Sequence, residues 1–387
     1  MEPVYVERRN TLCAKWDGLK ETFGADGLLP LWVADMDFRI DDHITDAINE
    51  YISEGVIGYH MVPDRYYDAF IRWEKEEHGL DVKREWIRFS PGVVTGFHMA
   101  VNMFTEPGDA VIINTPVYYP FMHAVRNNGR KMVTSELVNT DGRYIIDFDD
   151  FEAKITENNV RLFILCSPHN PVSRVWHEDE LARLLDICRS HDVTIISDEI
   201  HHDLVFGENR HIPTLSLATP DDKIVMLTAA SKSFNIAGLQ NSFVVIENAE
   251  LRRTWDNFSR GIRVQNGNPV GYIATMTAYE QGKPWLEAVK KRIYSNYEAM
   301  TARLRAEIDD VVVTPLEGTY LAWVDFGAYL KPEEIQPFMQ DKCKLAFDYG
   351  EWFGGTESGS HIRVNLATSE TNVLEATNRI ITNLSSY

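Results

Sequence analysis

The chain has 387 residues, of which 44% are hydrophobic, and a formal net charge of −20 at pH 7. Nucleic acid and anionic membrane surfaces repel such a chain, so we expect neither as a partner. The four cysteines are scattered without a Cys-x-x-Cys pair, which argues against a zinc site or a disulfide framework. The N-terminus has no apolar leader, and no segment reaches the ~18 apolar residues of a membrane span. A cytoplasmic location is therefore the default expectation.

The first 40 residues show little periodicity apart from one dense block at positions 31–38. Asp35 and Asp37 lie there between large apolar side chains, which predicts either a tight turn under the core or a loop of the functional site. Helical spacing follows from about Asp41 to Ser53, and again after Pro63.

Short apolar segments alternate with helical stretches from about Trp86 onward. The expected strands are residues 87–89, 110–113, 162–166, 194–197, 224–227 and 242–246. This alternation predicts crossover units, and hence a mostly parallel sheet with helices on both faces. The fold class is therefore α/β. We expect a large domain at 46–284 and a smaller α+β domain that combines 1–45 with 285–387.

Ligands of an open parallel sheet bind beyond the carboxyl ends of its strands, where four polar loops are predicted. The first, residues 90–96, could hold a phosphate on helix N-terminal N–H groups at Val93, Val94 and Thr95. A glycine turn capped by Thr95 fits the same residues. The second, residues 114–120, presents Tyr118 and Tyr119. One ring could stack on a flat heteroaromatic ligand, although such tyrosines more often serve as packing.

The third and fourth loops carry an amide and a carboxylate. Asn170 lies between prolines that restrict the backbone, so its amide could donate to a phenolate oxygen; an Asx turn is the alternative. Asp198 ends a buried strand and needs a cationic partner, such as a protonated ring nitrogen. His201 and His202 invite a metal interpretation, but neighbours in an extended chain point in opposite directions and no HExxH spacing is present. We therefore expect no metal site.

A lysine directly follows the apolar segment 224–227 and its small residues. Lys232 lies there between two serines, Ser231 and Ser233. Desolvating an ammonium group is costly, so such a lysine usually shifts its pKa or forms a covalent bond. A deprotonated lysine is the nucleophile that forms a Schiff base with an aldehyde. A lysine that extends from a strand end into solvent fits the same residues.

One cofactor, pyridoxal 5′-phosphate, needs all of these groups together. It requires a lysine for its aldehyde, a helix N-terminus for its phosphate, a stacking ring, a carboxylate for its pyridine nitrogen and a donor to O3′. The groups that could supply these are, in that order, Lys232, the Gly92 loop, Tyr118, Asp198 and Asn170. Each of these residues is weak evidence alone, but together they indicate one ligand, pyridoxal 5′-phosphate.

Four blocks of the chain resemble fold-type I pyridoxal-phosphate enzymes of the class I/II aminotransferase superfamily. They are residues 32–38, 167–171, 197–201 and 231–239. The first and the last look like those of the MalY/PatB-type cystathionine β-lyases, or C–S lyases. The resemblance implies a homodimer that cleaves L-cystathionine, L-cysteine or another S-conjugate to a thiol, pyruvate and ammonia. Transamination, and a second role in binding a transcription activator, are alternatives that the resemblance leaves open.

The resemblance also implies a role for individual residues. Lys232 would be the catalytic lysine, and Tyr59 would reach the partner's cofactor across the dimer. The implied cofactor-binding residues are Val93, Val94, Tyr118, Asn170, Asp198, His201, Ser231 and Lys232. The implied substrate-binding residues are Asp35, Tyr119 and Arg363, whose guanidinium would grip the α-carboxylate. His201 stands where many aminotransferases have a tyrosine, and Gln240 where many have a phosphate-binding arginine. Both departures weigh against transamination.

Overall fold

The computed structural model describes residues 2–385, and its central element is a seven-stranded sheet. Five neighbouring strands run parallel: β9 (Ile224–Thr228), β8 (Thr194–Asp198), β7 (Val160–Cys166), β3 (Ala110–Thr115) and β4 (Lys131–Glu136). Beyond β9, the antiparallel β10 (Ser242–Val245) pairs with β2 (Ile87–Ser90). All six predicted strands are present, and the predicted α/β class is confirmed. The edge strand β4 was missed because only two of its residues, the adjacent Met132 and Val133, are apolar.

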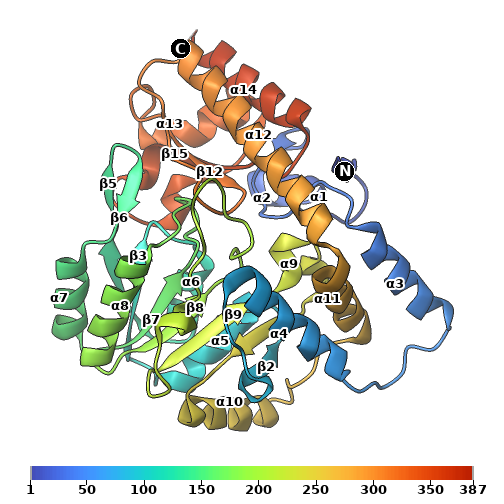
Figure 1. Ribbon diagram of the computed structural model, residues 1–387. Helices are drawn as coiled ribbons and strands as arrows, with labels where there is room; N and C mark the ends of the chain where they lie inside the picture. The colour runs from blue at the N-terminus through green and yellow to red at the C-terminus, as the bar shows by residue number, and fades with distance from the viewer. Residues whose placement is uncertain (1, 386–387) are drawn as a thin grey trace.

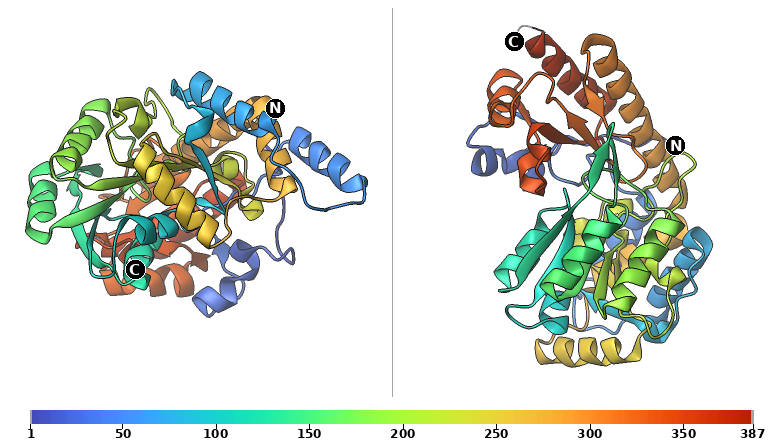
Figure 2. Two further views of the ribbon diagram at one scale, coloured as in Figure 1. Left: turned by 90° about the horizontal axis from the view of Figure 1, so that it is seen from below. Right: turned by 90° about the vertical axis from the view of Figure 1, so that its left-hand side faces the viewer.

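Helices cover both faces of this sheet, as Figures 1 and 2 show. In β9, Ile224 and Met226 enter one core, whereas Val225 and Leu227 enter the other. One face carries α5 (Val93–Phe104), α6 (Pro120–Asn127) and α10 (Ala249–Gly261). The other face carries α4 (Asp64–His78), α7 (Phe148–Asn158), α8 (Glu178–Ser190) and α11 (Pro269–Gln281). Burial on both sides explains why the strands are apolar throughout.

A second sheet lies above the first in Figure 1 and is antiparallel. Its strands are β11 (Val312–Val313), β12 (Leu321–Asp325), β15 (His361–Asn365) and β14 (Asp348–Tyr349). The long helix α12 (Lys283–Glu307) runs from α11 up to α14 (Glu370–Leu384). Near the N-terminus, β1 (Leu29–Pro30) pairs in parallel with β13 (Leu345–Ala346). This pairing joins the N-terminal segment to the C-terminal part of the chain.

Helix α3 (Asp42–Ser53) and the segment that follows it project from the rest of the chain in Figure 1. The segment carries four exposed apolar side chains, Val56, Ile57, Tyr59 and Met61. An exposed apolar group of this kind commonly marks a contact surface. Among the helices of residues 2–385, none has both the length and the apolar composition that crossing a membrane requires.

Candidate active site

A cavity of about 250 Å³ lies at the carboxyl ends of the sheet strands. Its wall is formed by the loops that follow β2, β3, β7, β8 and β9, as expected for an open parallel sheet. All eight residues that were expected to bind the cofactor line it: Val93, Val94, Tyr118, Asn170, Asp198, His201, Ser231 and Lys232. The four polar loops of the sequence therefore meet at one place.

Lys232 lies on the short helix α9 (Ala230–Ser233), directly after β9. Its Nζ donates a hydrogen bond of 2.6 Å to the carbonyl oxygen of Ala34. Burial lowers the pKa of Lys232 to about 8; the nearby Arg363 lowers it further, and the charges of Asp35 and Asp198 oppose the shift. At pH 7 about a tenth of this amine is uncharged, roughly 300 times more than for an ordinary lysine, which suits a nucleophile or a base.

The block at residues 31–38 is a loop of the site, because Ala34 forms part of the cavity wall. Tyr320 donates from its hydroxyl to the same Ala34 oxygen at 2.7 Å. Asn365 Nδ2 donates to the backbone oxygens of Val33 and Asp35 at 2.6 and 2.7 Å. The Asp35 side chain does not line the cavity, since its Oδ2 pairs with Arg8 at 2.9 Å. No sequence pattern predicted the contact between Tyr320 and Ala34, which joins the N-terminal loop to the C-terminal part of the chain.

Asp198 is 3% exposed and ends β8. Its Oδ1 accepts a hydrogen bond of 3.2 Å from the N–H of Ile200, and no cationic side chain within residues 2–385 forms an ion pair with it. Burial raises the pKa of Asp198 to about 7, although the Ile200 N–H and the Lys232 charge oppose the shift. A buried carboxylate without a cation needs a cationic ligand. This observation fits a protonated pyridine nitrogen.

Asn170, Tyr118 and His201 form the wall near Asp198. Asn170 Oδ1 accepts from Arg363 Nη1 at 3.0 Å, so the amide N–H₂ of Asn170 remains available to a ligand. His201 Nδ1 is buried and has no hydrogen-bond partner among the described residues. Burial, together with the charges of Lys232 and Arg363, holds the pKa of His201 well below its usual value, so its imidazole is neutral. Burial also raises the pKa of Tyr118, whose phenol stays protonated.

The N-terminus of α5 forms another part of the wall and has no side-chain cap. Gly92 precedes it with φ 90°, a conformation that favours glycine and turns the chain sharply into the helix. Uncapped N–H groups and the positive end of the helix dipole suit a phosphate. Ser231 and Gln240 also line the cavity, and Gln240 brings no charge to it.

Arg363 and Tyr119 lie next to the cavity and not on its wall. Arg363 is 2% exposed on β15, where its Nη2 donates to the oxygen of Trp32 at 3.0 Å. Arg363 also pairs with the buried carboxylate of Asp348, its direct neighbour in register on β14. Tyr119 packs its ring against Phe353, with centroids 5.6 Å apart. No sequence pattern indicated Asp348, because only the pairing of β14 with β15 brings it to Arg363.

Tyr59 is the predicted site residue that the single chain does not bring near the cavity. Its side chain is fully exposed in the segment after α3. Within one chain, Tyr59 therefore does not reach Lys232 or the wall of the cavity.

Comparisons with known proteins identify the family. The model for aminotransferase class I and II matches residues 56–380. Cystathionine β-lyase PatB of Bacillus subtilis (strain 168) is 41% identical over 380 residues, which covers 97% of both chains. Protein MalY of Escherichia coli (strain K12) is 31% identical over 366 residues, 93% of this chain and 92% of that protein. The PLP-bound C–S lyase from Staphylococcus hominis is 35% identical, with a TM-score of 0.92 over 98% of this chain and 97% of that chain. The chain therefore belongs to the aminotransferase class I and II family, in the branch that contains PatB and MalY.

Proposed function

We propose that this protein is a pyridoxal 5′-phosphate-dependent carbon–sulfur β-lyase. It would convert L-cystathionine, or another amino acid with sulfur at Cβ, to a thiol, pyruvate and ammonia. One observation carries the proposal: the low-pKa amine of Lys232 and the unpaired buried carboxylate of Asp198 line the same cavity. The relatives support it, since PatB is a cystathionine β-lyase and the Staphylococcus hominis protein is a PLP-bound C–S lyase.

The cavity offers a group for each end of the cofactor. The N–H groups of Val93 and Val94, with Ser231, would hold the phosphate. Tyr118 would pack against the ring, and Asn170 would donate to O3′. Asp198 would keep the pyridine nitrogen protonated. When bound, pyridoxal 5′-phosphate supplies an aldehyde that captures the substrate amine and a ring that accepts the electrons left at Cα.

Lys232 is the group that we assign to proton transfer. The Ala34 carbonyl holds its Nζ at the cavity wall, and burial lowers the pKa of this amine to about 8, which raises its neutral fraction far above that of an ordinary lysine. A neutral amine in this place can take the proton from Cα. Arg363 would bind the α-carboxylate through N–H groups that its contacts with Asn170, Trp32 and Asp348 leave free, such as that of Nε, and so orient the Cα–H bond toward Nζ. The thiolate would then depart from Cβ.

Pyruvate release from L-cystathionine tests the proposal. The cofactor-loaded protein is incubated with this substrate, with and without an added keto acid. Pyruvate and ammonia in the absence of the keto acid are the expected products. Amino transfer that depends on the keto acid, without pyruvate release, would instead make the protein an aminotransferase. Absence of both products would contradict the lyase proposal for this substrate.

Replacing Arg363 with alanine should raise KM for amino acid substrates far more than it lowers kcat. A hydrogen-bonded charge contributes about 1.5–3 kcal/mol, which corresponds to a rise in KM of about 10- to 150-fold. Initial rates over a range of substrate concentrations measure this change. Arg65→Ala is the matched control, because Arg65 is an exposed arginine whose ion pair, with Glu280, lies outside the cavity. An unchanged KM in Arg363→Ala would contradict the assignment. The double variant Arg363→Ala/Asp348→Asn shows how much of the effect comes from leaving Asp348 unpaired.

The cofactor-free protein should capture pyridoxal 5′-phosphate faster as the pH rises through about 8, the pKa of Lys232. Below this pH the amine carries a proton and cannot attack an aldehyde, so the rate should change about tenfold per pH unit. Above it the amine is neutral and the rate should level off. Stopped-flow absorbance of the cofactor measures the rate, with Lys232→Ala as the control. A midpoint near the ordinary lysine pKa of 10.5 would show that burial does not act on Lys232 in this way.

We further propose that the protein is a homodimer in which Tyr59 of one subunit completes the site of the other. The exposed apolar segment around Tyr59 supports this proposal. Mixed dimers of Lys232→Ala and Tyr59→Ala subunits, obtained by co-expression with two tags, test it. If Tyr59 acts across the dimer, one of the two sites of each mixed dimer is intact, so the doubly tagged mixed dimers should have about half of the wild-type activity. If Tyr59 acts in its own subunit or not at all, the mixture gains nothing over its components.

A further inference from the structure

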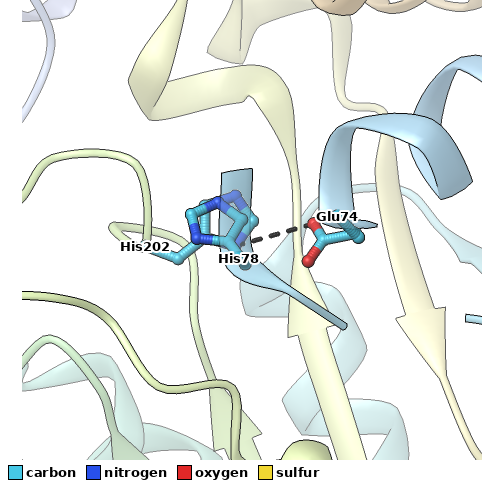
Figure 3. Close-up of side chains that lie close together, drawn as sticks. All are labelled: Glu74, His78 and His202. Carbon is cyan, nitrogen blue, oxygen red and sulfur yellow. Dashed lines mark ion pairs between the residues drawn. The ribbon is translucent and has the colours of Figure 1, made fainter. Parts of the chain in front are cut away.

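A second group of buried polar side chains lies behind the loop that follows β8. His201 faces the cofactor cavity, whereas the next residue, His202, faces this group. Glu74 and His78 reach it from α4, where their spacing of four residues puts them on one helix face. One ligand atom from each of Glu74, His78 and His202 lies within 4.8 Å of the other two (Figure 3).

The carboxylate of Glu74 is the group that protein contacts leave unexplained. Its side chain is 0% exposed, and neither oxygen has a hydrogen-bond partner among the described residues. Oε1 lies 3.8 Å from His202 Nδ1, beyond hydrogen-bond distance. Figure 3 shows the carboxylate directed at the two imidazole rings. A buried carboxylate in this situation needs a further partner.

A different carboxylate holds the two imidazoles through their Nε2 atoms, and His202 Nδ1 also lies 3.1 Å from Thr228 Oγ1, a contact that a metal ion on Nδ1 would replace. Asp203 faces Nε2 of His78 at 2.8 Å with Oδ1, and Nε2 of His202 at 3.2 Å with Oδ2. Metal-binding histidines are commonly oriented by a carboxylate in this manner. In a tetrahedral zinc site the ligand atoms are about 3.4 Å apart. Glu74 Oε1 and His202 Nδ1, 3.8 Å apart, are near this spacing, whereas the whole group spans up to 4.8 Å and must close further to share one ion.

A hollow of about 560 Å³ leads from the surface to His78 and His202, whereas Glu74 lies behind its wall. Its wall extends from the exposed side chains of Glu76 and Lys283 to the rings of His78 and His202. The hollow supplies an entry path for an ion and room for water ligands.

We propose that Glu74, His78 and His202 bind a divalent transition-metal ion of the zinc type, with water completing the coordination. Two imidazole nitrogens and a carboxylate oxygen are a donor set that Zn²⁺ accepts. The ion would link α4 to the loop after β8. Asp203 also accepts a hydrogen bond from Ser233, the neighbour of Lys232, so the same site supports the turn that carries the catalytic lysine.

Metal titration of the cofactor-loaded protein tests this site. After removal of metal by a chelator, isothermal titration with ZnCl₂ should show one Zn²⁺ per chain. Glu74→Gln keeps the shape of the side chain but removes its charge, and should weaken Zn²⁺ binding at least about tenfold, as should His78→Gln. Glu152→Gln is the matched control, because Glu152 pairs with a single histidine, His191, at the surface. Its Zn²⁺ affinity should equal that of the wild type.

The wild-type protein offers a test that needs no substitution. Crystals grown with ZnCl₂ should show an anomalous zinc peak between Glu74, His78 and His202. The proposal is overturned if no peak lies there, or if both substitutions leave Zn²⁺ affinity unchanged. In either case the group is a network of buried histidines and carboxylates that share protons without metal.

Discussion

Lys232→Ala should abolish pyruvate release and lower kcat by about 10³-fold or more. Lys232 is the one lysine among the described residues that line the cavity, so no neighbouring amine can replace it. Borohydride reduction of the loaded wild-type protein should attach the cofactor's mass to the peptide that contains Lys232. The variant should lose this attachment together with its activity.

Lys223→Ala is the control for this experiment. Lys223 pairs with Asp192 at 2.6 Å, partly exposed to solvent and away from the cavity. Its removal should leave both pyruvate release and the mass label unchanged. If Lys232→Ala kept the activity of the wild type when saturated with cofactor, the lyase assignment and its mechanism would both fail.

Asp198→Asn should lower kcat by about 100-fold or more while leaving the fold intact. The amide keeps the shape of the carboxylate but cannot stabilise a positive charge on the pyridine nitrogen. Asp198 is the one carboxylate among the described residues that line the cavity, so no other carboxylate of this wall compensates for it. Steady-state kinetics of pyruvate release measure the effect.

Two comparisons separate this role of Asp198 from a general loss of structure. Asp198→Glu retains the charge and should recover part of the activity. A cofactor methylated at the ring nitrogen carries a permanent positive charge there, and should raise the activity of Asp198→Asn relative to the ordinary cofactor. Equal activity of Asp198→Asn with the two cofactors would argue that Asp198 acts in another way.

The sequence predicted the sheet and the meeting of the four loops because both follow from local patterns. Apolar segments of strand length alternate with helices, and parallel strands present their carboxyl ends at one edge. Asp198 ends one of these strands, and Asn170 and Lys232 each come four residues after the end of another, so their convergence required no knowledge of side-chain packing. Large apolar residues and two aspartates are concentrated at residues 31–38, but only the structure shows that the Ala34 carbonyl faces the cavity.

The contacts around Arg363 and Asp35 were decided by long-range packing. Arg363 meets Asp348 because β14 and β15 pair in one particular register. Asp35 turns to Arg8 because the N-terminal segment folds back beside the loop, and this leaves the cavity wall to Ala34. Neither contact involves a spacing or a composition that a sequence pattern can show.

The sequence by itself determined the fold class, the family resemblance and the loops that carry the chemistry, because these depend on periodicity and on residue types at strand ends. Only the tertiary structure brought Glu74 and His78 of α4 to His202 of the β8 loop. His201 and His202 line different cavities, as the sequence argument expected, although they lie in a turn and not in an extended chain. No sequence pattern predicted that Glu74 and His78 lie beside His202, because more than a hundred residues separate them from His202 along the chain. Which side chains meet across such distances is set by the packing of helices on the sheet.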